Sequence, residues 1–553
     1  MQRRITFILL SIFIAFLPIQ AQEDDHYFEV SKNLQVFNGL FKHLDILYVD
    51  TISPSAAIEN AINGMLGKLD PYTEFYPASK SNELTEMLTG RFAGIGSVIR
   101  FNQKLKNVVI EEPSEGMPAV QAGLKKGDII VAINDSSMAG KDVQYVTKRL
   151  RGEAGTSLKL TVRRPTTGKI INVNITRKLI EDQPVPFYGM LTDEVGYVKL
   201  TSFTEDCSKK VRRAIIELKE QGMKKLIFDL RENGGGAELE AVNTVNIFVD
   251  KDELIVSNRG KLPQVNRDYR TTMEPLDLQL PVVVLVDDGS ASSSEIVAGS
   301  LQDLDRAVIM GQRTFGKGLV QIPIDLDYGS QMKVTASKYY IPSGRCIQAI
   351  DYRRSRSGYT GHVPDSLTKV FLTRNGREVR DGGGIKPDIE IMPDTMANIS
   401  VYLSYSDSTE VMRDYVIDYI ASHPTIAKPS EFQLSESDFA EFKQRVLASG
   451  FTYDRQSEKY IAELEKLIRF EGYYDDAREE IEALKGKLQH NVAKDLDYNR
   501  DEICRLIEGD IASAYYYRKG VIEQYLRFDR QILAAIDLLN DTARYNSTLN
   551  RTE

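Results

Sequence analysis

The pattern of apolar and polar positions divides the chain after residue 21 into four segments. Apolar residues recur at helical spacing over much of 22–89, whereas short β-like runs separated by glycines fill 90–180. Strand-like and helix-like runs alternate over 181–395. From 396 to 553 the chain is charged, rich in Tyr and carries apolar stripes at i, i+3, i+4, as amphipathic helices do. This pattern predicts a multidomain α+β protein in which 181–395 forms an α/β layer with crossover helices.

Several elements can be placed by residue number. Within the β-rich segment we expect one helical insert, at residues 141–151. The proline-containing run LDPYTEFYP (69–77) ends the helical pattern that precedes it. In the α/β segment the expected order is strand GYVKLTSF, helix 205–221, strand KKLIFDLR, a helix from about 237, strand 282–286 and helix 292–303.

The first 21 residues have the pattern of a secretory signal. Arg3 and Arg4 precede an apolar run over 5–19, and the small residue Ala21 follows. A run of this length is shorter than the roughly 18 apolar residues of a membrane span. We therefore expect an exported protein of the periplasm or cell envelope. An uncleaved anchor, which would attach the protein to the membrane, is the alternative.

Composition and charge narrow the function classes. The chain has 553 residues, which suggests about three or four domains, and its net charge of −9 without a long basic run argues against nucleic acid as the main partner. Three Cys and five His are scattered, without a CxxC or HExxH pattern. We expect no metal, no cofactor and no disulfide scaffold, so hydrolytic chemistry would have to find its base outside histidine.

A serine cluster provides the densest chemical signal. In PVVVLVDDGSASSSEIVAG (281–299) an apolar strand ends in Asp-Asp-Gly, and serines then open a helix. A serine at a helix N-terminus lies where free N–H groups and the helix dipole favour a developing oxyanion. The alternative is a purely structural capping box between Ser292 and Glu295.

Two glycine-rich segments add candidate chemistry. In GQRTFGKGLVQ (311–321) Lys317 lies between two glycines; the segment is not a phosphate-binding loop, because Gly318 replaces Ser/Thr and a strand pattern follows. Lys317 is a candidate base in its neutral form, which burial favours, or else a solvated loop lysine. In LIFDLRENGGGAELEAV (226–242) three glycines follow a strand, and their amides suit an oxyanion hole or a simple turn.

Together these segments resemble the C-terminal processing peptidases, also called tail-specific proteases, which are serine proteases with a Ser-Lys dyad and an inserted PDZ domain. The matching motifs run in order over about 28–392: LDPYTEFY, RFAGIGSVI, AVQAGLKKGDIIVAIND, DLRENGGG, GSASSSEIVAG, TFGKGLVQ, KYYIPSGR and DGGGIKPD. The resemblance implies a PDZ domain at 90–180 and a crotonase/ClpP-like α/β protease core at 181–395. The residue pattern itself adds a signal peptide at 1–21, a helical N-terminal region at 22–89 and a helical C-terminal domain at 396–553, and this last domain lies outside the common family core.

The resemblance also implies roles for individual residues. Ser292 is the expected nucleophile, Lys317 the general base and Gln321 its orienting partner, since Gln321 keeps the parity of Lys317 along the following strand. Glu295 occupies a position tied to the active site. The expected oxyanion donors are the backbone N–H of Ser293 and that of Gly235 or Gly236.

The match is not complete at the nucleophile. Ser293 and Ser294 stand where the family commonly has Ala, so Ser290 and Ser294 remain alternative nucleophiles. Gly234 stands where the family often has Pro. A Ser-His-Asp triad would have to use His362, which lies in a charged, glycine-bearing segment that is typical of a surface loop.

The PDZ resemblance predicts the substrate class. Gly94, Ile95 and Gly96 would bind a free C-terminal carboxylate, so the expected partners are proteins or peptides with apolar C-terminal tails, cut upstream of the tail. A scaffold that binds tails without cutting them is the alternative. The helices of 396–553 would pack on the protease core, form a homodimer or bind an adaptor, and core packing is favoured.

Overall fold

The computed structural model describes residues 2–81, 84, 86, 89–349, 365–406, 408–488 and 491–550, with side chains from residue 25 onward. The chain forms two compact units, one made of 1–81 with 322–334 and the other of 82–321 with 335–553.

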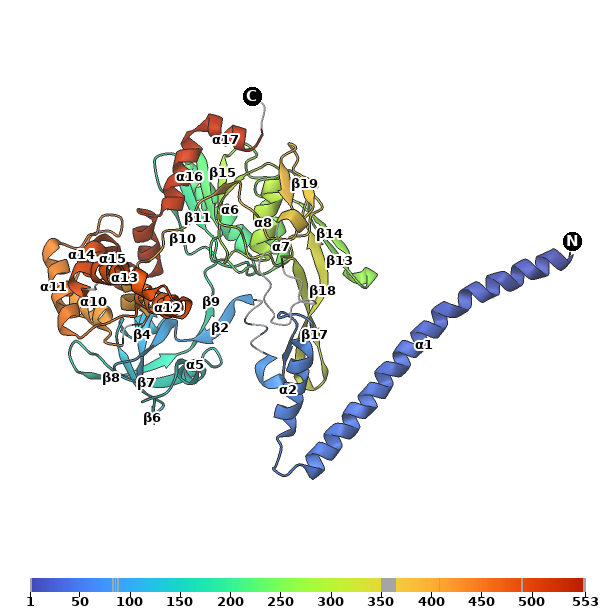
Figure 1. Ribbon diagram of the computed structural model, residues 1–553, viewed down its shortest axis with the longest axis horizontal. Coiled ribbons are helices and arrows are strands. Elements are labelled where there is room, and N and C mark those ends of the chain that lie inside the picture. The colour runs from blue at the N-terminus through green and yellow to red at the C-terminus, as the bar shows by residue number, and fades with distance from the viewer. Residues whose placement is uncertain are drawn as a thin grey trace. The chain divides into compact units, whose positions relative to one another are not determined.

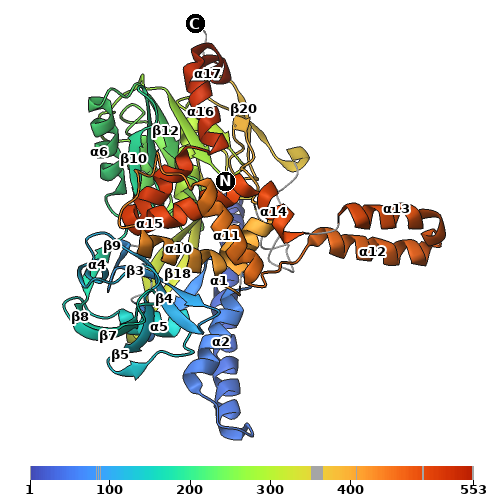
Figure 2. The same cartoon turned by 90° about the vertical axis from the view of Figure 1, so that its left-hand side faces the viewer.

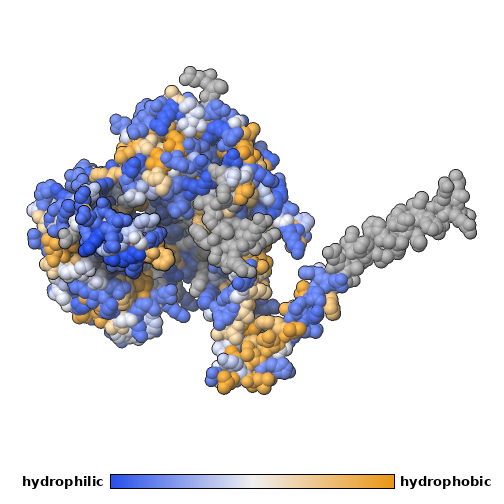
Figure 3. All heavy atoms as spheres, viewed as in Figure 1, coloured by the Kyte–Doolittle hydropathy of each residue, from blue (hydrophilic) through white to orange (hydrophobic). Residues whose placement is uncertain are grey.

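The smaller unit is mainly helical, as its spacing predicted. It contains α1 (Gln2–Leu47) and α2 (Pro54–Leu66), and the Ser53 hydroxyl accepts a hydrogen bond from the first turn of α2. In LDPYTEFYP the chain leaves the helical pattern and forms β1 (Glu74–Tyr76), which pairs with the start of β18 (Gln331–Tyr340). Figure 3 shows apolar residues gathered on the surface of this unit. Of the helices described, none has an apolar stretch long enough to cross a membrane.

The β-rich segment forms an open sheet whose edge strands are β3 and β8. Its strand order is β3-β4-β5-β7-β8, with β6 on β5, and β2 and β9 pair separately. The predicted helix is α5 (Val143–Leu150), which begins after the capping residue Asp142 and contacts the edge strand β3. The bounds are β2 Arg91–Gly94, β3 Ser97–Asn102, β4 Asn107–Pro113, β5 Ile129–Ile133, β6 Ser136–Ser137, β7 Ser157–Arg163, β8 Ile170–Thr176 and β9 Lys178–Glu181.

The α/β segment is built on a six-stranded sheet of order β10-β11-β12-β15-β16-β21. All neighbouring pairs after β10–β11 are parallel, which requires crossover connections. The predicted strands and helices of this segment are confirmed to within a few residues at their ends. The bounds are β10 Phe187–Met190, β11 Val195–Lys199, α6 Cys207–Glu220, β12 Lys225–Asp229, α7 Glu238–Val245, β15 Val282–Val286, α8 Ser293–Asp303, β16 Val308–Gly311 and β21 Ile389–Glu390.

Different parts of the chain cover the two faces of this sheet. On one face α6, α7 and α8 pack against Val282, Val284 and Val286 in a large buried cluster. On the other face α16 (Arg530–Asn540) and α17 (Thr542–Thr548) cover Val283 and Leu285 (Figure 1). Because helices cover both faces of the sheet, β15 is apolar at every position: a parallel strand buried on both faces needs apolar side chains on both.

A second, antiparallel layer lies beside the central sheet. Its strands are β13 (Leu254–Gly260), β14 (Arg267–Arg270), β17 (Leu319–Asp325) and β18. β13 pairs with the second half of β18 and contacts α8. This pairing brings Tyr339 of β18 close to the start of α8.

The remaining C-terminal helices form a domain with its own core. Val416, Phe442 and Ile507 lie in its buried cluster. Figure 2 shows α12 and α13 as an antiparallel pair extending from this domain. The bounds are α9 Asn398–Val401, α10 Val411–Ser422, α11 Glu436–Ala448, α12 Gln456–Glu471, α13 Tyr474–Lys487, α14 Val492–Tyr498 and α15 Arg500–Leu526.

Buried ion pairs attach this helical domain to the β-rich domain. The ammonium group of Lys126 lies 3.5 Å from Asp510 and 3.3 Å from Glu111, and its side chain is only 8% exposed. Arg100 on β3 donates to Glu410 at 2.9 Å. The C-terminal helices therefore pack on both the sheet and the β-rich domain, as favoured for 396–553.

Candidate active site

Three motif segments meet at one edge of the central sheet. The DLRENGGG segment follows β12, the serine cluster follows β15, and the Lys317 segment follows β16. These strands are parallel neighbours in the order β12-β15-β16, so their carboxyl ends lie side by side. In open α/β sheets this edge is where ligands bind.

Ser292 occupies a strained turn at the entrance to α8. Its backbone has φ 55° and ψ −113°, a conformation that non-glycine residues rarely adopt. Its main-chain N–H donates to Glu295 Oε2 at 2.8 Å, which forms the Glu295 half of the capping box. Strain of this kind persists only where the surroundings impose it, and it is common at active sites.

The neighbouring serines are used by the fold. Ser290 is fully buried and donates to Leu230 O at 2.9 Å, and Ser294 is fully buried and donates to Asn233 O at 2.7 Å. The Ser293 hydroxyl donates to Gly236 O at 2.9 Å. Ser292 is only partly buried, whereas the other three serines are buried.

Glu295 connects the serine segment to the lysine segment. Its Oε2 accepts from Ser292 N and from Lys317 N at 2.9 Å, while its Oε1 accepts from Thr314 Oγ1 at 2.5 Å and Gly316 N at 2.7 Å. Because both main-chain nitrogens donate to the same oxygen of Glu295, Ser292 N and Lys317 N lie within two hydrogen-bond lengths of each other. Complete burial raises the pKa of Glu295 to about 7, although these four donors act in the opposite direction.

Tyr339 links the same two segments from the other layer. Its hydroxyl lies 2.8 Å from Lys317 O and 3.2 Å from Ser292 O. Tyr339 is almost fully buried, and the pairing of β18 with β13 fixes its place. No role was predicted for Tyr339 itself, although it lies in KYYIPSGR, one of the motifs of the resemblance.

Gln321 lies on β17, four residues beyond Lys317. Its side-chain amide donates to Thr335 Oγ1 of β18 at 3.2 Å. Leu319–Asp325 is a strand, as the pattern after Lys317 predicted, so Gln321 is held by the same antiparallel layer that carries Tyr339.

The glycine segment lies directly against Ser292. Gly235 has φ 99°, and a Cβ placed on it would lie 2.8 Å from Ser292 Cβ and 3.0 Å from Ser293 N. Its own N–H donates to Asn233 Oδ1 at 2.9 Å. Within the residues described, the N–H groups of Gly236 and Ser293 donate to no protein acceptor. These two amides are therefore the ones available to an oxyanion in this conformation.

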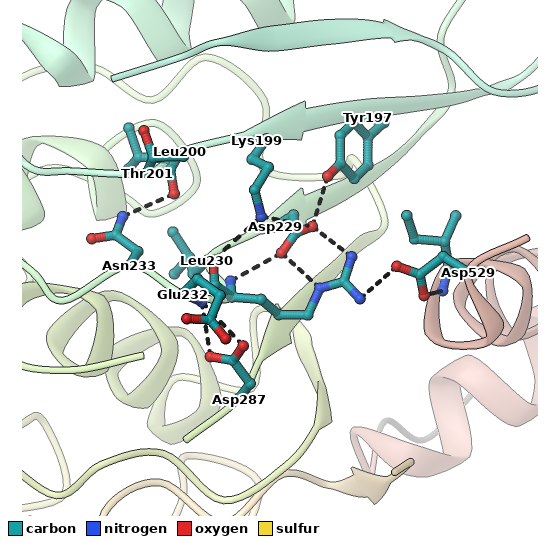
Figure 4. A network of polar contacts seen from close by, with 12 residues as sticks. Tyr197, Lys199, Leu200, Thr201, Asp229, Leu230, Glu232, Asn233, Asp287 and Asp529 are labelled. Carbon is teal, nitrogen blue, oxygen red and sulfur yellow. Dashed lines mark hydrogen bonds and ion pairs between the residues drawn. The ribbon is translucent and has the colours of Figure 1, made fainter. Parts of the chain in front are cut away.

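A buried network of charged side chains lies at the start of the DLRENGGG segment (Figure 4). Arg231 donates to both oxygens of Asp229, at 3.0 and 2.7 Å, and Tyr197 donates to the same carboxylate at 2.6 Å. Burial alone would raise the pKa of Asp229, but Arg231 and Lys199 more than offset it and hold that pKa well below its usual range. The partners of Arg231 beyond Asp229 are Asp529 and Gln531, about 300 residues away, so no local pattern marks Arg231 as part of a network.

The predicted loop of the β-rich domain precedes the edge strand β3. Gly94 ends β2, and Ile95 and Gly96 connect it to the edge strand β3. The carbonyls of Ile95 and Gly96 accept from Ala119 and Ser114 inside the domain, whereas their N–H groups have no acceptor among the described residues. The loop and edge can therefore accept both a carboxylate and an added strand.

Two sequence alternatives need comment. His362 lies outside the described residues, so a triad built on it has no described geometry. Across the described ranges, no three side chains of His, Cys, Asp or Glu converge in a group able to hold a metal ion.

Comparison with known proteins relates this geometry to a family. Residues 194–354 match peptidase family S41, residues 109–164 match a PDZ domain, and residues 400–539 match the probable PDZ-protease C-terminal helical domain. A carboxy-terminal-processing protease of Bartonella bacilliformis is 34% identical over 357 residues, which cover 63% of this chain and 81% of the relative. The chain belongs to the carboxy-terminal-processing proteases of family S41. It is thus a serine peptidase with a PDZ domain.

Two further proteins are also similar to this chain. A probable CtpA-like serine protease of Staphylococcus aureus strain RF122 is 33% identical over 320 residues, and this chain spans 62% of its length. A solved photosystem II D1 C-terminal processing protease is 28% identical, with a TM-score of 0.36, over 65% of this chain and 92% of the other.

Proposed function

We propose that this peptidase is an exported endopeptidase that binds the C-terminal tails of proteins through its PDZ domain and cleaves them with Ser292 and Lys317. The observation that carries the proposal is the shared anchoring of these two residues. One carboxylate, Glu295, and one hydroxyl, Tyr339, each contact the backbones of both Ser292 and Lys317. Residues 25 positions apart in sequence are thereby fixed to one another.

In the proposed reaction the neutral amine of Lys317 removes the hydroxyl proton of Ser292 as its Oγ attacks the scissile carbonyl carbon. The carbonyl oxygen becomes an oxyanion, which accepts hydrogen bonds from the N–H groups of Ser293 and Gly236. The ammonium of Lys317 then gives its proton to the leaving amine as the C–N bond breaks. The product is an ester on Ser292, and a water molecule activated by Lys317 hydrolyses it.

The surrounding residues have supporting roles in this proposal. Gln321 orients the Lys317 side chain from the adjoining strand, and Glu295 positions both reacting residues through their backbones. Gly235 leaves the space that Ser292 needs, while its N–H is engaged by Asn233. Ser290 and Ser294 are weaker candidates for the nucleophile, because their hydroxyls are buried and bonded to main-chain carbonyls.

Tail recognition is proposed at the edge strand β3. A peptide adding to this edge would place its carboxylate on the N–H groups of the Gly94–Ile95–Gly96 loop, between β3 and α5. Apolar neighbours of the loop favour an apolar last residue. Export rests on the positively charged start and the apolar run of 5–19.

A tail-binding scaffold without activity is the competing function. Ser292→Ala and Lys317→Ala, assayed on an unfolded polypeptide with an apolar C-terminus, separate the two. We expect a loss of about 10³-fold or more for each variant, because residues that act as one catalytic unit fail together. Lys317→Arg, which keeps the positive charge, should be equally inactive, since arginine does not give up its proton.

Two controls complete the assay. The same polypeptide with an amidated C-terminus should be a poorer substrate of the wild type, because it lacks the carboxylate. Wild-type protein that binds tails but never cuts them would favour the scaffold, and full activity of Ser292→Ala would refute the dyad.

A further inference from the structure

The C-terminal helices contact the segment that carries the proposed oxyanion donors. The contact lies at Arg231, five residues before Gly236, in the turn that follows β12. Arg231 Nη1 donates to Asp529 Oδ2 at 2.7 Å and to Gln531 Oε1 at 2.7 Å. Both acceptors come from the junction of α15 and α16, about 300 residues further along the chain.

The guanidinium of Arg231 thus binds acceptors from two parts of the protein at once. Its Nε and Nη2 donate to Asp229 and its Nη1 donates to Asp529, two carboxylates that Figure 4 shows on separate elements. Asp229 is fully buried on β12, so it fixes the inner side of Arg231. Asp529 fixes the outer side, and a planar guanidinium held on both sides cannot rotate freely.

Asp529 is itself held in place. Its Oδ1 accepts from Gln531 N at 2.9 Å and Ile532 N at 3.2 Å, which caps the N-terminus of α16. The helix that begins there packs on the central sheet through Ile532, Ala535 and Leu538. One oxygen of Asp529 therefore caps the helix, while the other accepts from Arg231.

From Arg231 a short chain of contacts leads to the serine. Lys199 Nζ donates to Arg231 O at 3.3 Å, and Glu232, the next residue, has a left-handed φ of 59°. Asn233 follows: its carbonyl accepts from Ala291 N at 3.0 Å, and its side chain accepts from Gly235 N. The placing of the 231–236 turn thus affects both the glycines and the residue before Ser292.

The ion pair lies at a cavity and not in a sealed core. A cavity of about 630 Å³ is lined by Arg231, Asp529, Gln531, Tyr525 and Phe528, among others. The side chain of Asp529 is 24% exposed and that of Arg231 is 14% exposed. A change of charge at Asp529 can therefore be tolerated without unfolding the sheet.

We propose that Asp529 is a positioning residue for catalysis, which holds Arg231 so that the turn 231–236 presents the Gly236 N–H to the oxyanion. The C-terminal helices then complete the active site from behind, in addition to packing on the core. This inference rests on the proposed function, since it assumes that Gly236 is an oxyanion donor for the ester formed on Ser292.

Asp529→Asn tests the proposal, because asparagine caps helices as well as aspartate but cannot form the ion pair. We expect kcat to fall about tenfold, about 1.4 kcal/mol, with KM unchanged, since the affected contact acts in the transition state. Rates are normalised to titrated active sites, so that a loss of folded protein is not counted as a loss of kcat. Asp529→Glu, which keeps the charge, should recover most of the rate.

Two further variants separate positioning from stability. Asp541→Asn changes the capping aspartate of α17 on the same face of the sheet, and it should leave kcat unchanged. Arg231→Lys should lower kcat, and adding Asp529→Asn to it should lower kcat little further, because both changes act through one contact.

Three outcomes would overturn the proposal: wild-type kcat in Asp529→Asn, a loss explained wholly by fewer titrated sites, or full additivity with Arg231→Lys. The proposed function fails separately, through activity of Ser292→Ala.

Discussion

The two faces of the central sheet differ in where their covering helices come from. On one face, α6, α7 and α8 are the crossover connections between successive strands, and α8 begins directly after Ser292. On the other face, α16 and α17 arrive from the far end of the chain, after a separate helical domain. The first face carries α8, which follows the proposed nucleophile Ser292, and on the second face Asp529 and Gln531 contact Arg231.

The difference shows that one sheet can carry a site built from the segments between its own strands while helices from the far end of the chain cover its other face. The segments proposed to be catalytic follow the neighbouring strands β12, β15 and β16, so each lies at the end of a strand that its own sequence marks. The opposite face depends on contacts over about 250 residues, and its loss would expose Val283, Leu285 and Met310 to water. We expect changes on the first face to affect mainly the rate and changes on the second to affect mainly stability.

Among changes that keep the proposed Ser292–Lys317 dyad, Gly235→Ala should lower the rate most. A Cβ at this position would press on Ser292 Cβ and Ala291 O, at 2.8 and 2.7 Å, and φ 99° strains any other residue. We expect kcat/KM to fall by about 10² or more, as when an oxyanion contact is lost. Steady-state kinetics on a tail peptide measure the effect.

Gly234→Ala is the matched control for that prediction. Gly234 adjoins Gly235, but a Cβ on it would meet nothing within 4 Å. Its kinetics should stay close to wild type. Equal losses in both variants would mean that the whole glycine run, and not the contact with Ser292, limits the rate.

Leu538→Ala should have the largest effect on stability among changes to the second face. Leu538 of α16 is fully buried against the sheet, and truncating a buried leucine costs about 2–5 kcal/mol. The calorimetric transition of the protease core should move to lower temperature, while kcat per titrated site stays within about twofold. Leu533→Ala, at a position 46% exposed on the same helix, should change neither.

Glu295→Gln should produce a smaller, pH-dependent effect. Because burial raises the pKa of Glu295 to about 7 from 4.5, the native carboxyl holds its proton more tightly than the unfolded chain does. The contribution of Glu295 to the free energy of unfolding therefore falls as pH rises from about 4.5 to about 7, by at most about 1.4 kcal/mol per pH unit.

Calorimetry of wild type and Glu295→Gln across this range checks the sign. The wild type should lose stability relative to the variant as pH rises. The variant should also be less active, since an amide nitrogen cannot accept from the donors that contact Glu295. A wild type that gains stability relative to the variant with rising pH would contradict the assigned burial effect.

Sequence patterns predicted the first face better than the second. The uninterrupted apolar run Val282–Val286 matched β15 at both ends, because a strand buried on both faces leaves an unmistakable pattern. The three chemical segments were found because each is a short run of unusual residues at a strand end. The proposed roles of Ser292, Lys317, Gln321 and Glu295 and the domain boundaries remain predictions.

Other parts of the site could not be read from the sequence, for physical reasons. Tyr339 reaches Ser292 and Lys317 only because β18 pairs with β13, and a single sequence does not reveal such a pairing. The ion pair of Arg231 with Asp529 depends on α16 packing on the sheet. The amphipathic stripe of α16 predicted a buried face but not the surface that buries it.

Trapping the acyl-enzyme tests the central claim most directly. A tail peptide ester is mixed with the protein, the reaction is quenched in acid within the first turnover, and the attachment site is read by mass spectrometry. We predict one acyl group on Ser292 in the wild type and none in Lys317→Ala. An acyl group on Ser290 or Ser294, or cleavage without any acylated serine, would contradict the account.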